Sequence, residues 1–178
     1  GFAGLEYVHM PLPGERLVAF LSDGAWEEQK GSDWAPRWWR REDCGLVVPI
    51  MIANGRRIDQ RTTMAQEGGA QWFAHYLKLH GFDPVIIDGR DPLAFAWAII
   101  DCEQKLRVQE EVGAVHVRLP YVIAVAPKGA GFYGEGTNAA HNLPLGDNPS
   151  KSKKAAGLFN KHAHKLWVPE AELKNAAA

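Results

Sequence analysis

Four short apolar runs, each bounded by turn residues or charges, dominate the hydrophobic pattern of this chain. They are Leu17–Leu21, Leu46–Ile52, Pro84–Ile87 and Tyr121–Val125. Continuous rather than alternating hydrophobicity over such short lengths is typical of strands covered on both faces, as in a parallel sheet. The pattern therefore predicts four buried strands.

Two longer segments between these runs carry apolar residues at helical spacing. The first begins at a cap on Thr62 or Thr63 and runs to about residue 80. The second has Asp91 as its cap and Pro92 at its first position, and it ends near residue 113. Because strands and helices alternate, we expect an α/β fold with a doubly wound, mainly parallel sheet flanked by helices.

Composition and charge exclude several classes of protein. The 178 residues are 46% hydrophobic and 23% charged, which is ordinary for a globular domain that needs no disulfide framework. A net charge of -1 argues against a dedicated binder of nucleic acid or anionic membrane. The two cysteines, Cys44 and Cys102, favour a reducing compartment, and no apolar run approaches the ~20 residues of a membrane span. We therefore expect a cytoplasmic protein.

The same patterning suggests how the chain is organised. We expect residues 1–150 to form the α/β domain and residues 151–178 to form a basic helical tail or linker. Residues 129–154 are rich in Gly, Asn and Pro, and a loop of that length is usually functional or disordered. Residues 24–45 combine tryptophans with arginines, which is compatible with a nucleic-acid surface. Their acidic residues cancel that charge, however, and favour a crossover helix that buries its indoles.

Polar residues beside glycine follow three of the predicted strands. These strand ends are Ser22–Gly24, Asn54–Gly55 and Pro127–Gly129. Ligands of open α/β sheets bind at the carboxyl ends of the strands. The carboxylate of Asp23 and the amide oxygen of Asn54 are hard ligands suited to Mg²⁺ or Ca²⁺, and Lys128 could attract an anion. Asp-Gly alone is also a common turn, so the prediction of a cation site depends on the two strand ends lying side by side.

Asn54 lies 31 positions after Asp23, and each directly follows an apolar strand. This spacing resembles the thiamine-diphosphate fingerprint, in which Gly-Asp-Gly is followed at a comparable distance by Asn. Further segments resemble phosphoketolases, whose motifs Pro-Ile-Leu-His-Leu-Asn-Gly, Gly-Tyr-Glu-Pro, Glu-Gly-Asp-Asp-Pro, Thr-Pro-Lys-Gly and Ala-His-Gln-Val-Pro-Leu occur in this order. The similar segments here are Pro49–Gly55, His80–Pro84, Asp88–Pro92, Ala126–Gly129 and Ala140–Leu145.

The resemblance implies the C-terminal part of a diphosphate-binding domain. Phosphoketolases use thiamine diphosphate to split xylulose 5-phosphate or fructose 6-phosphate with inorganic phosphate. By this resemblance, Asp23, Asn54 and the backbone carbonyl of Arg56 would hold the Mg²⁺ (or Ca²⁺) that clamps the cofactor.

The resemblance also implies roles for three further residues. Gly24 would donate its N–H group to the diphosphate, and Lys128 and His141 would line the cofactor phosphates and the substrate channel. His141 is the candidate catalytic residue, because an imidazole can donate to a phosphate or shuttle a proton.

Several departures from the family pattern concern the substrate more than the cofactor. Ser22 replaces the first glycine of the fingerprint, and the loop from Lys128 to His141 is shorter than in the family. Ala25 stands where phosphoketolases carry a Glu, for which Glu27 or Glu28 could substitute only if the chain shifts.

No segment resembles the family's pyrimidine-binding domain, so we expect a fragment that is inactive alone. A homo-oligomer or a partner chain would complete the site. Two alternatives are a transketolase-like or epimerase-like ketose-phosphate enzyme and a non-catalytic binding or assembly module. An exposed apolar patch is expected both for the enzyme fragment and for the assembly module.

The remaining histidines and both cysteines lack a comparable pattern. His162 and His164 could chelate a metal, but the flanking lysines favour a solvated helix face. The residues expected to have ordinary surface or structural roles are His75, His80, His116, Cys44 and Cys102.

Overall fold

The computed structural model describes residues 16–28, 47–113, 118–141 and 144–177. The chain divides into two compact units, residues 1–127 and residues 128–178, which are described separately below. The boundary expected near residue 150 therefore lies inside the second unit.

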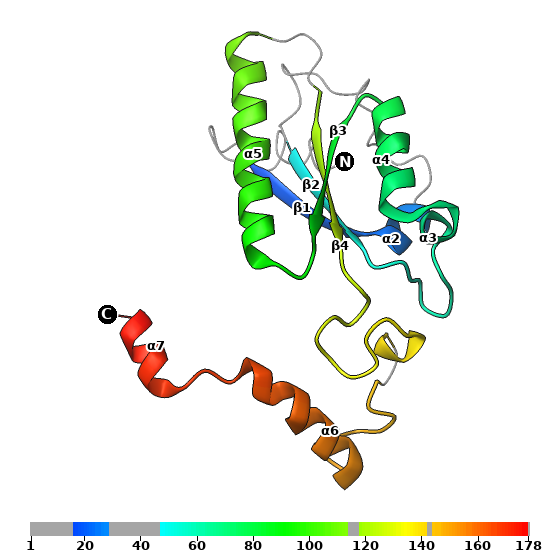
Figure 1. Ribbon diagram of the computed structural model, residues 1–178, viewed down its shortest axis with the longest axis vertical. Helices are drawn as coiled ribbons and strands as arrows, with labels where there is room; N and C mark the ends of the chain where they lie inside the picture. Colours follow the sequence, from blue (N-terminus) through cyan, green and yellow to red (C-terminus); the bar gives the residue numbers. More distant parts are fainter. Residues whose placement is uncertain (1–15, 29–46, 114–117, 142–143, 178) are drawn as a thin grey trace. The chain divides into compact units, whose positions relative to one another are not determined.

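The first unit is built on a sheet of four parallel strands. The strands are β1 (Leu17–Ser22), β2 (Val47–Ala53), β3 (Asp83–Asp88) and β4 (Pro120–Val125). Their order across the sheet is β1-β2-β4-β3, and every pairing is parallel. The helices are α2 (Asp23–Glu28), α3 (Thr63–Glu67), α4 (Gly69–Leu79) and α5 (Pro92–Glu111). Figure 1 shows α4 and α5 on opposite faces of the sheet. The α/β fold with a parallel sheet is confirmed.

The two central strands are the most deeply buried strands of the sheet. Ile50 and Met51 of β2 and Tyr121 and Val122 of β4 are fully buried, whereas the edge strands β1 and β3 are mostly half-buried. Phe73 of α4 packs edge-on against Tyr121, with ring centroids 5.7 Å apart. The central strands therefore fix the positions of the strand ends on either side.

Local sequence explains where the helices begin and end. The Thr62 side chain accepts a hydrogen bond from Ala65 N and caps α3, and Asp91 caps α5 through Leu93 N. The helix expected over 62–80 is instead two helices. The break falls at Gly68 and Gly69, which have φ values of 134° and 66° that other residues rarely adopt.

The second unit contains a glycine-rich loop and the helices α6 (Lys153–Ala163) and α7 (Glu170–Ala176). The short 3₁₀ segments η2 (Asn138–Ala140) and η3 (His164–Leu166) accompany them. Phe132 of the loop packs against Phe159 and His162 of α6, with ring centroids 6.3 and 5.3 Å apart. The loop from residue 128 to 141 thus has a defined fold of its own.

Candidate functional site

Asp23 and the segment that begins at Asn54 meet at the carboxyl edge of the sheet. Ser22, the last residue of β1, pairs with Ile52 of β2, so the chain leaves both strands at the same level. Asp23 Oδ2 then accepts a hydrogen bond from Gly55 N at 2.7 Å. The predicted juxtaposition of the first two strand ends is confirmed.

Neutral donors surround the carboxylate of Asp23, which is only 1% exposed. Its Oδ1 accepts from Gly24 N at 2.9 Å, and its Oδ2 accepts from Thr62 Oγ1 at 3.2 Å in addition to Gly55 N. Burial raises the pKa of Asp23 more than these hydrogen bonds lower it, and the charge of Glu27 raises this pKa further. A nearby cation would therefore favour the ionised form of this carboxylate.

The loop after β2 carries the other two candidate oxygen ligands, the Asn54 side chain and the Arg56 carbonyl. The half-buried Asn54 accepts a hydrogen bond from Arg56 N at its Oδ1 (2.9 Å), which holds the side chain against its own loop. Gly55 has φ of 75°, and its carbonyl accepts from Thr62 N at 3.0 Å, which closes the loop. This closure brings the Arg56 carbonyl to the first turn of α2.

Gly24 makes close approach to that loop possible. A Cβ atom at Gly24 would lie 3.2 Å from Arg57 Cγ and 3.5 Å from the Arg56 carbonyl oxygen. The absence of a side chain therefore lets α2 and the loop pack together. The N–H group of Gly24 donates to Asp23, however, and not outward to a separate anion.

Glu27 is a part of this cluster whose burial the sequence did not reveal. It is 5% exposed, and its Oε1 accepts from Met64 N at 2.7 Å near the start of α3. Its Oε2 is buried without a hydrogen-bond partner in the described chain, and the nearest cation in an ion pair is Arg57, with Nε at 3.7 Å. The adjacent Trp26 packs on Phe73 of α4. One side of α2 therefore faces the core.

The donor atoms fit a small divalent cation. A carboxylate, an amide oxygen and a backbone carbonyl oxygen are the ligand types that Mg²⁺ and Ca²⁺ prefer. Within the described residues, no group of three or more His, Cys, Asp or Glu side chains could hold a metal ion. The candidate set at Asp23, Asn54 and Arg56 has one such side chain and would complete its coordination with water or phosphate oxygens.

Lys128 and His141 belong to the second unit. The Lys128 carbonyl accepts from Gly136 N at 2.8 Å, and the exposed His141 donates its backbone N–H group to Asn138 O at 3.1 Å. A Cβ atom at Gly129 would lie 2.7 Å from Ala140 Cβ, so glycine is required where the two ends of the loop meet. The loop brings the segments of Lys128 and His141 together, and their roles toward a cofactor stay predictions.

Other residues singled out from the sequence have more ordinary surroundings. Cys102 is buried in the core, and burial raises its thiol pKa to about 11. His162 is half-buried against Phe132, so the expectation of a fully solvated position is wrong for it, whereas His164 is exposed. The residues that lie outside the described part of the chain are Trp34, Arg37, Trp38, Trp39, Arg40, Arg41, Cys44 and His116.

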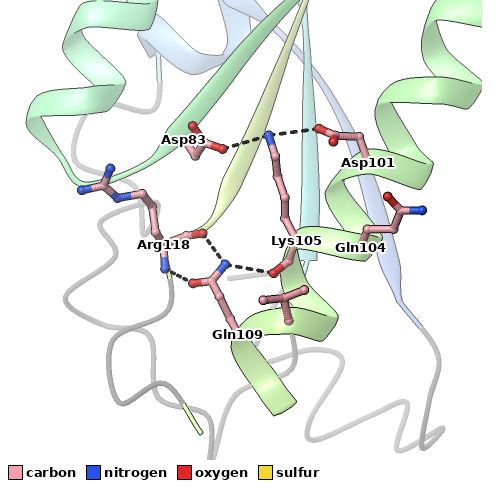
Figure 2. Close-up of a pocket in the computed structure, with 7 residues that line it drawn as sticks. Asp83, Asp101, Gln104, Lys105, Gln109 and Arg118 are labelled. Carbon is pink, nitrogen blue, oxygen red and sulfur yellow. Dashed lines mark hydrogen bonds and ion pairs between the residues drawn. The ribbon is translucent and has the colours of Figure 1, made fainter. Parts of the chain in front are cut away.

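A cavity of about 420 Å³ lies at the opposite, amino-terminal edge of the sheet (Figure 2). Lys105 Nζ lies between Asp83 and Asp101, at 2.9 and 3.0 Å from their carboxylates. Gln109 donates to and accepts from the backbone of Arg118, which ties the end of α5 to the start of β4. The paired charges of this cavity indicate a structural role.

Comparison with models of protein families and with curated proteins finds no match for this chain. The resemblance to phosphoketolases therefore rests on the sequence motifs. In the part of the chain that the structure describes, no helix is both long and apolar enough to cross a membrane.

Proposed function

We propose that the carboxyl edge of β1 and β2 binds Mg²⁺ and the diphosphate of thiamine diphosphate. The observation that carries this proposal is the buried carboxylate of Asp23 beside the loop at Asn54; all of its hydrogen-bond donors among the described residues are neutral. Burying a carboxylate without a countercharge is costly, and a divalent cation at this place would remove that cost.

The chain's own residues would hold and orient the bound group. Asp23, Asn54 and the carbonyl of Arg56 would bind the cation. Gly55 N and Thr62 Oγ1 already fix the orientation of the Asp23 carboxylate, as outer hydrogen bonds do at metal sites. When bound, thiamine diphosphate supplies the reactive carbon that attacks a substrate carbonyl, and the protein supplies position and charge.

The motifs support a more specific proposal, a phosphoketolase-like enzyme that acts on ketose phosphates. In such an enzyme, Lys128 and His141 would contact phosphate groups of the cofactor or the substrate, as the resemblance implies. The pyrimidine-binding half of the site would come from outside these 178 residues, so they would bind the cofactor weakly by themselves and would not turn over substrate.

Calorimetric titration of the full chain in millimolar Mg²⁺ tests the proposal. We expect inorganic pyrophosphate and thiamine diphosphate to bind with similar affinity, because both offer the diphosphate, and thiamine to give no heat. Asp23→Asn should abolish binding. Asp88→Asn is the matched control, because Asp88 is an exposed aspartate at the end of β3 on the same edge of the sheet. Equal binding by both variants, or none by the wild type, would overturn the proposal.

The exposed apolar residues of α5 fit an assembly module as well as they fit a cofactor half-site. Four large apolar residues of α5 are exposed by about half or more, as the expected patch requires: Leu93, Trp97, Ile100 and Val108. A cofactor half-site would need a docking surface too, so self-association does not separate the two functions. The Asp23→Asn titration does separate them, because an assembly module would bind no diphosphate.

A further inference from the structure

Arg57 lies directly beside the candidate cation site. Its Cγ is 3.2 Å from the position of a Cβ atom on Gly24, the residue that follows Asp23. Its side chain is 31% exposed, so the guanidinium is neither buried in the core nor extended freely into solvent. A second arginine of the same loop, Arg61, donates to Ala65 O at 2.9 Å and is exposed.

The carboxylate of Glu27 is in position to hold Arg57 there. Glu27 is itself fixed, because its Oε1 accepts from Met64 N and its side chain is 3% exposed. Its Oε2 lies 3.7 Å from Arg57 Nε, too far for a good hydrogen bond but close enough for an ion pair. Gln60 Oε1 accepts from Arg57 Nη2 at 3.4 Å on the other side.

From this geometry we infer that Arg57 is a phosphate-binding residue of the site and that Glu27 is its positioning residue. The inference rests on the proposed function and assigns part of it, the recognition of the anion, to a pair outside the predicted ligands. A guanidinium offers donors in a planar fork that matches phosphate oxygens. Held beside Gly24, it would neutralise diphosphate charge that one Mg²⁺ leaves uncompensated.

The inference can be tested by measuring the binding of pyrophosphate and of Mg²⁺ separately. We expect Arg57→Gln to weaken pyrophosphate binding about tenfold in excess Mg²⁺, the scale of one charged hydrogen bond. The same variant should bind Mg²⁺ alone as well as the wild type or better, because a nearby positive charge has been removed. Arg57→Lys should restore part of the lost pyrophosphate affinity. Arg61→Gln is the matched control and should change neither affinity by more than about twofold.

Glu27 is tested through its coupling to Arg57. Glu27→Gln should lower pyrophosphate affinity in the wild type but not in the Arg57→Gln background, because its effect acts through the guanidinium. A merely structural role would give the same loss in both backgrounds and would overturn the assignment of Glu27. Urea unfolding of each variant checks that the fold is retained.

The outcomes separate this inference from the proposed function. If Asp23→Asn loses Mg²⁺ and pyrophosphate while Arg57→Gln keeps its pyrophosphate affinity, the site stands and the assignment of Arg57 is wrong. If the wild type binds neither Mg²⁺ nor pyrophosphate, both are wrong. Equal losses in Arg57→Gln and Arg61→Gln would show that the whole loop charge acts, which also overturns a specific contact.

Discussion

The two edges of the sheet each bring two carboxylates and one cation together, but the charged groups differ in burial and in how closely they pair. At the amino-terminal edge, Lys105 lies 2.9 and 3.0 Å from the carboxylates of Asp83 and Asp101. The three side chains are 40%, 42% and 50% exposed, so water screens their charges. This edge is electrostatically complete without a ligand.

At the carboxyl edge, the carboxylates are buried and less well compensated. Asp23 accepts hydrogen bonds from neutral groups, and Glu27 has Arg57 at 3.7 Å. Within the residues that the structure describes, side chains of similar types therefore balance their charges closely at one edge and only loosely at the other. Uncompensated, buried charge marks a functional site better than the presence of acidic residues does.

The largest expected effect comes from removing the buried carboxylate. Asp23→Ala should lower the free energy of unfolding by about 3 kcal/mol in a chelating buffer, since Gly24 N, Gly55 N and Thr62 Oγ1 lose their acceptor. Asp83→Ala, at the other edge, should cost less than about 1 kcal/mol. Urea unfolding measures both, and equal losses would contradict the contrast between the edges.

A smaller effect is expected from the hydroxyl group that supports Asp23. Thr62→Val removes the hydroxyl group that donates to Asp23 and accepts from Ala65 N at the start of α3. It should lower the free energy of unfolding by about 1.5 kcal/mol. Thr63→Val, one position along and exposed, is the matched control and should cost less than about 0.5 kcal/mol. Similar losses in the two variants would show that β-branched packing, and not the hydroxyl group, matters here.

Removal of the Lys105 charge at the amino-terminal edge should lower the free energy of unfolding by less than these two changes do. Lys105→Met breaks both ion pairs, but its partners remain solvated, so we expect a loss of about 0.5 kcal/mol that shrinks in high salt. Urea unfolding at two salt concentrations checks this, with Lys78→Met on the exposed face of α4 as control. A decrease of more than about 2 kcal/mol in the free energy of unfolding would contradict the view that solvent screens the charges of this edge.

The smallest effect concerns pH. Hydrogen bonds from Arg90 lower the pKa of the exposed Asp88 to about 2, below its ordinary value of 3.8. Its stabilising contribution is therefore fully present above pH 3.8 and is lost as the pH falls through about 2. Asp88→Asn should flatten the acid limb of the stability curve between these values and leave it unchanged at neutral pH. An unchanged acid limb would contradict the Arg90 pair.

The sequence allowed the elements of the fold to be predicted well. Continuous apolar runs predicted all four strands to within a residue or two, and Asp91 with Pro92 predicted the start of α5. The order of the strands could not be predicted, because the runs at β1 and β2 look alike although one lies at an edge and the other in the centre. The break at Gly68 and Gly69 was missed because the prediction extended the helical pattern that follows these glycines back to the cap at Thr62 or Thr63.

The candidate site was predictable only in part. Asp23 and Asn54 could be paired from sequence because both follow strands, and parallel strands end at a common edge. Glu27 was considered only as one of the acidic residues of 24–45 and as a possible substitute for the family's Glu, since its burial depends on Met64 and on a loop that closes only in three dimensions. The direction of the Gly24 N–H group was likewise set by a side chain, Asp23, and not by the motif.

The strand order has a consequence for how this chain folds. β2 pairs with β4 in the centre of the sheet, Ile50 opposite Val122, although α3, α4, β3 and α5 lie between them in the sequence. That pairing must close a long loop, whose entropy is lost before the core is gained. Because β2 also carries the loop of Asn54, we expect the site to form late in folding, together with the last long-range contacts.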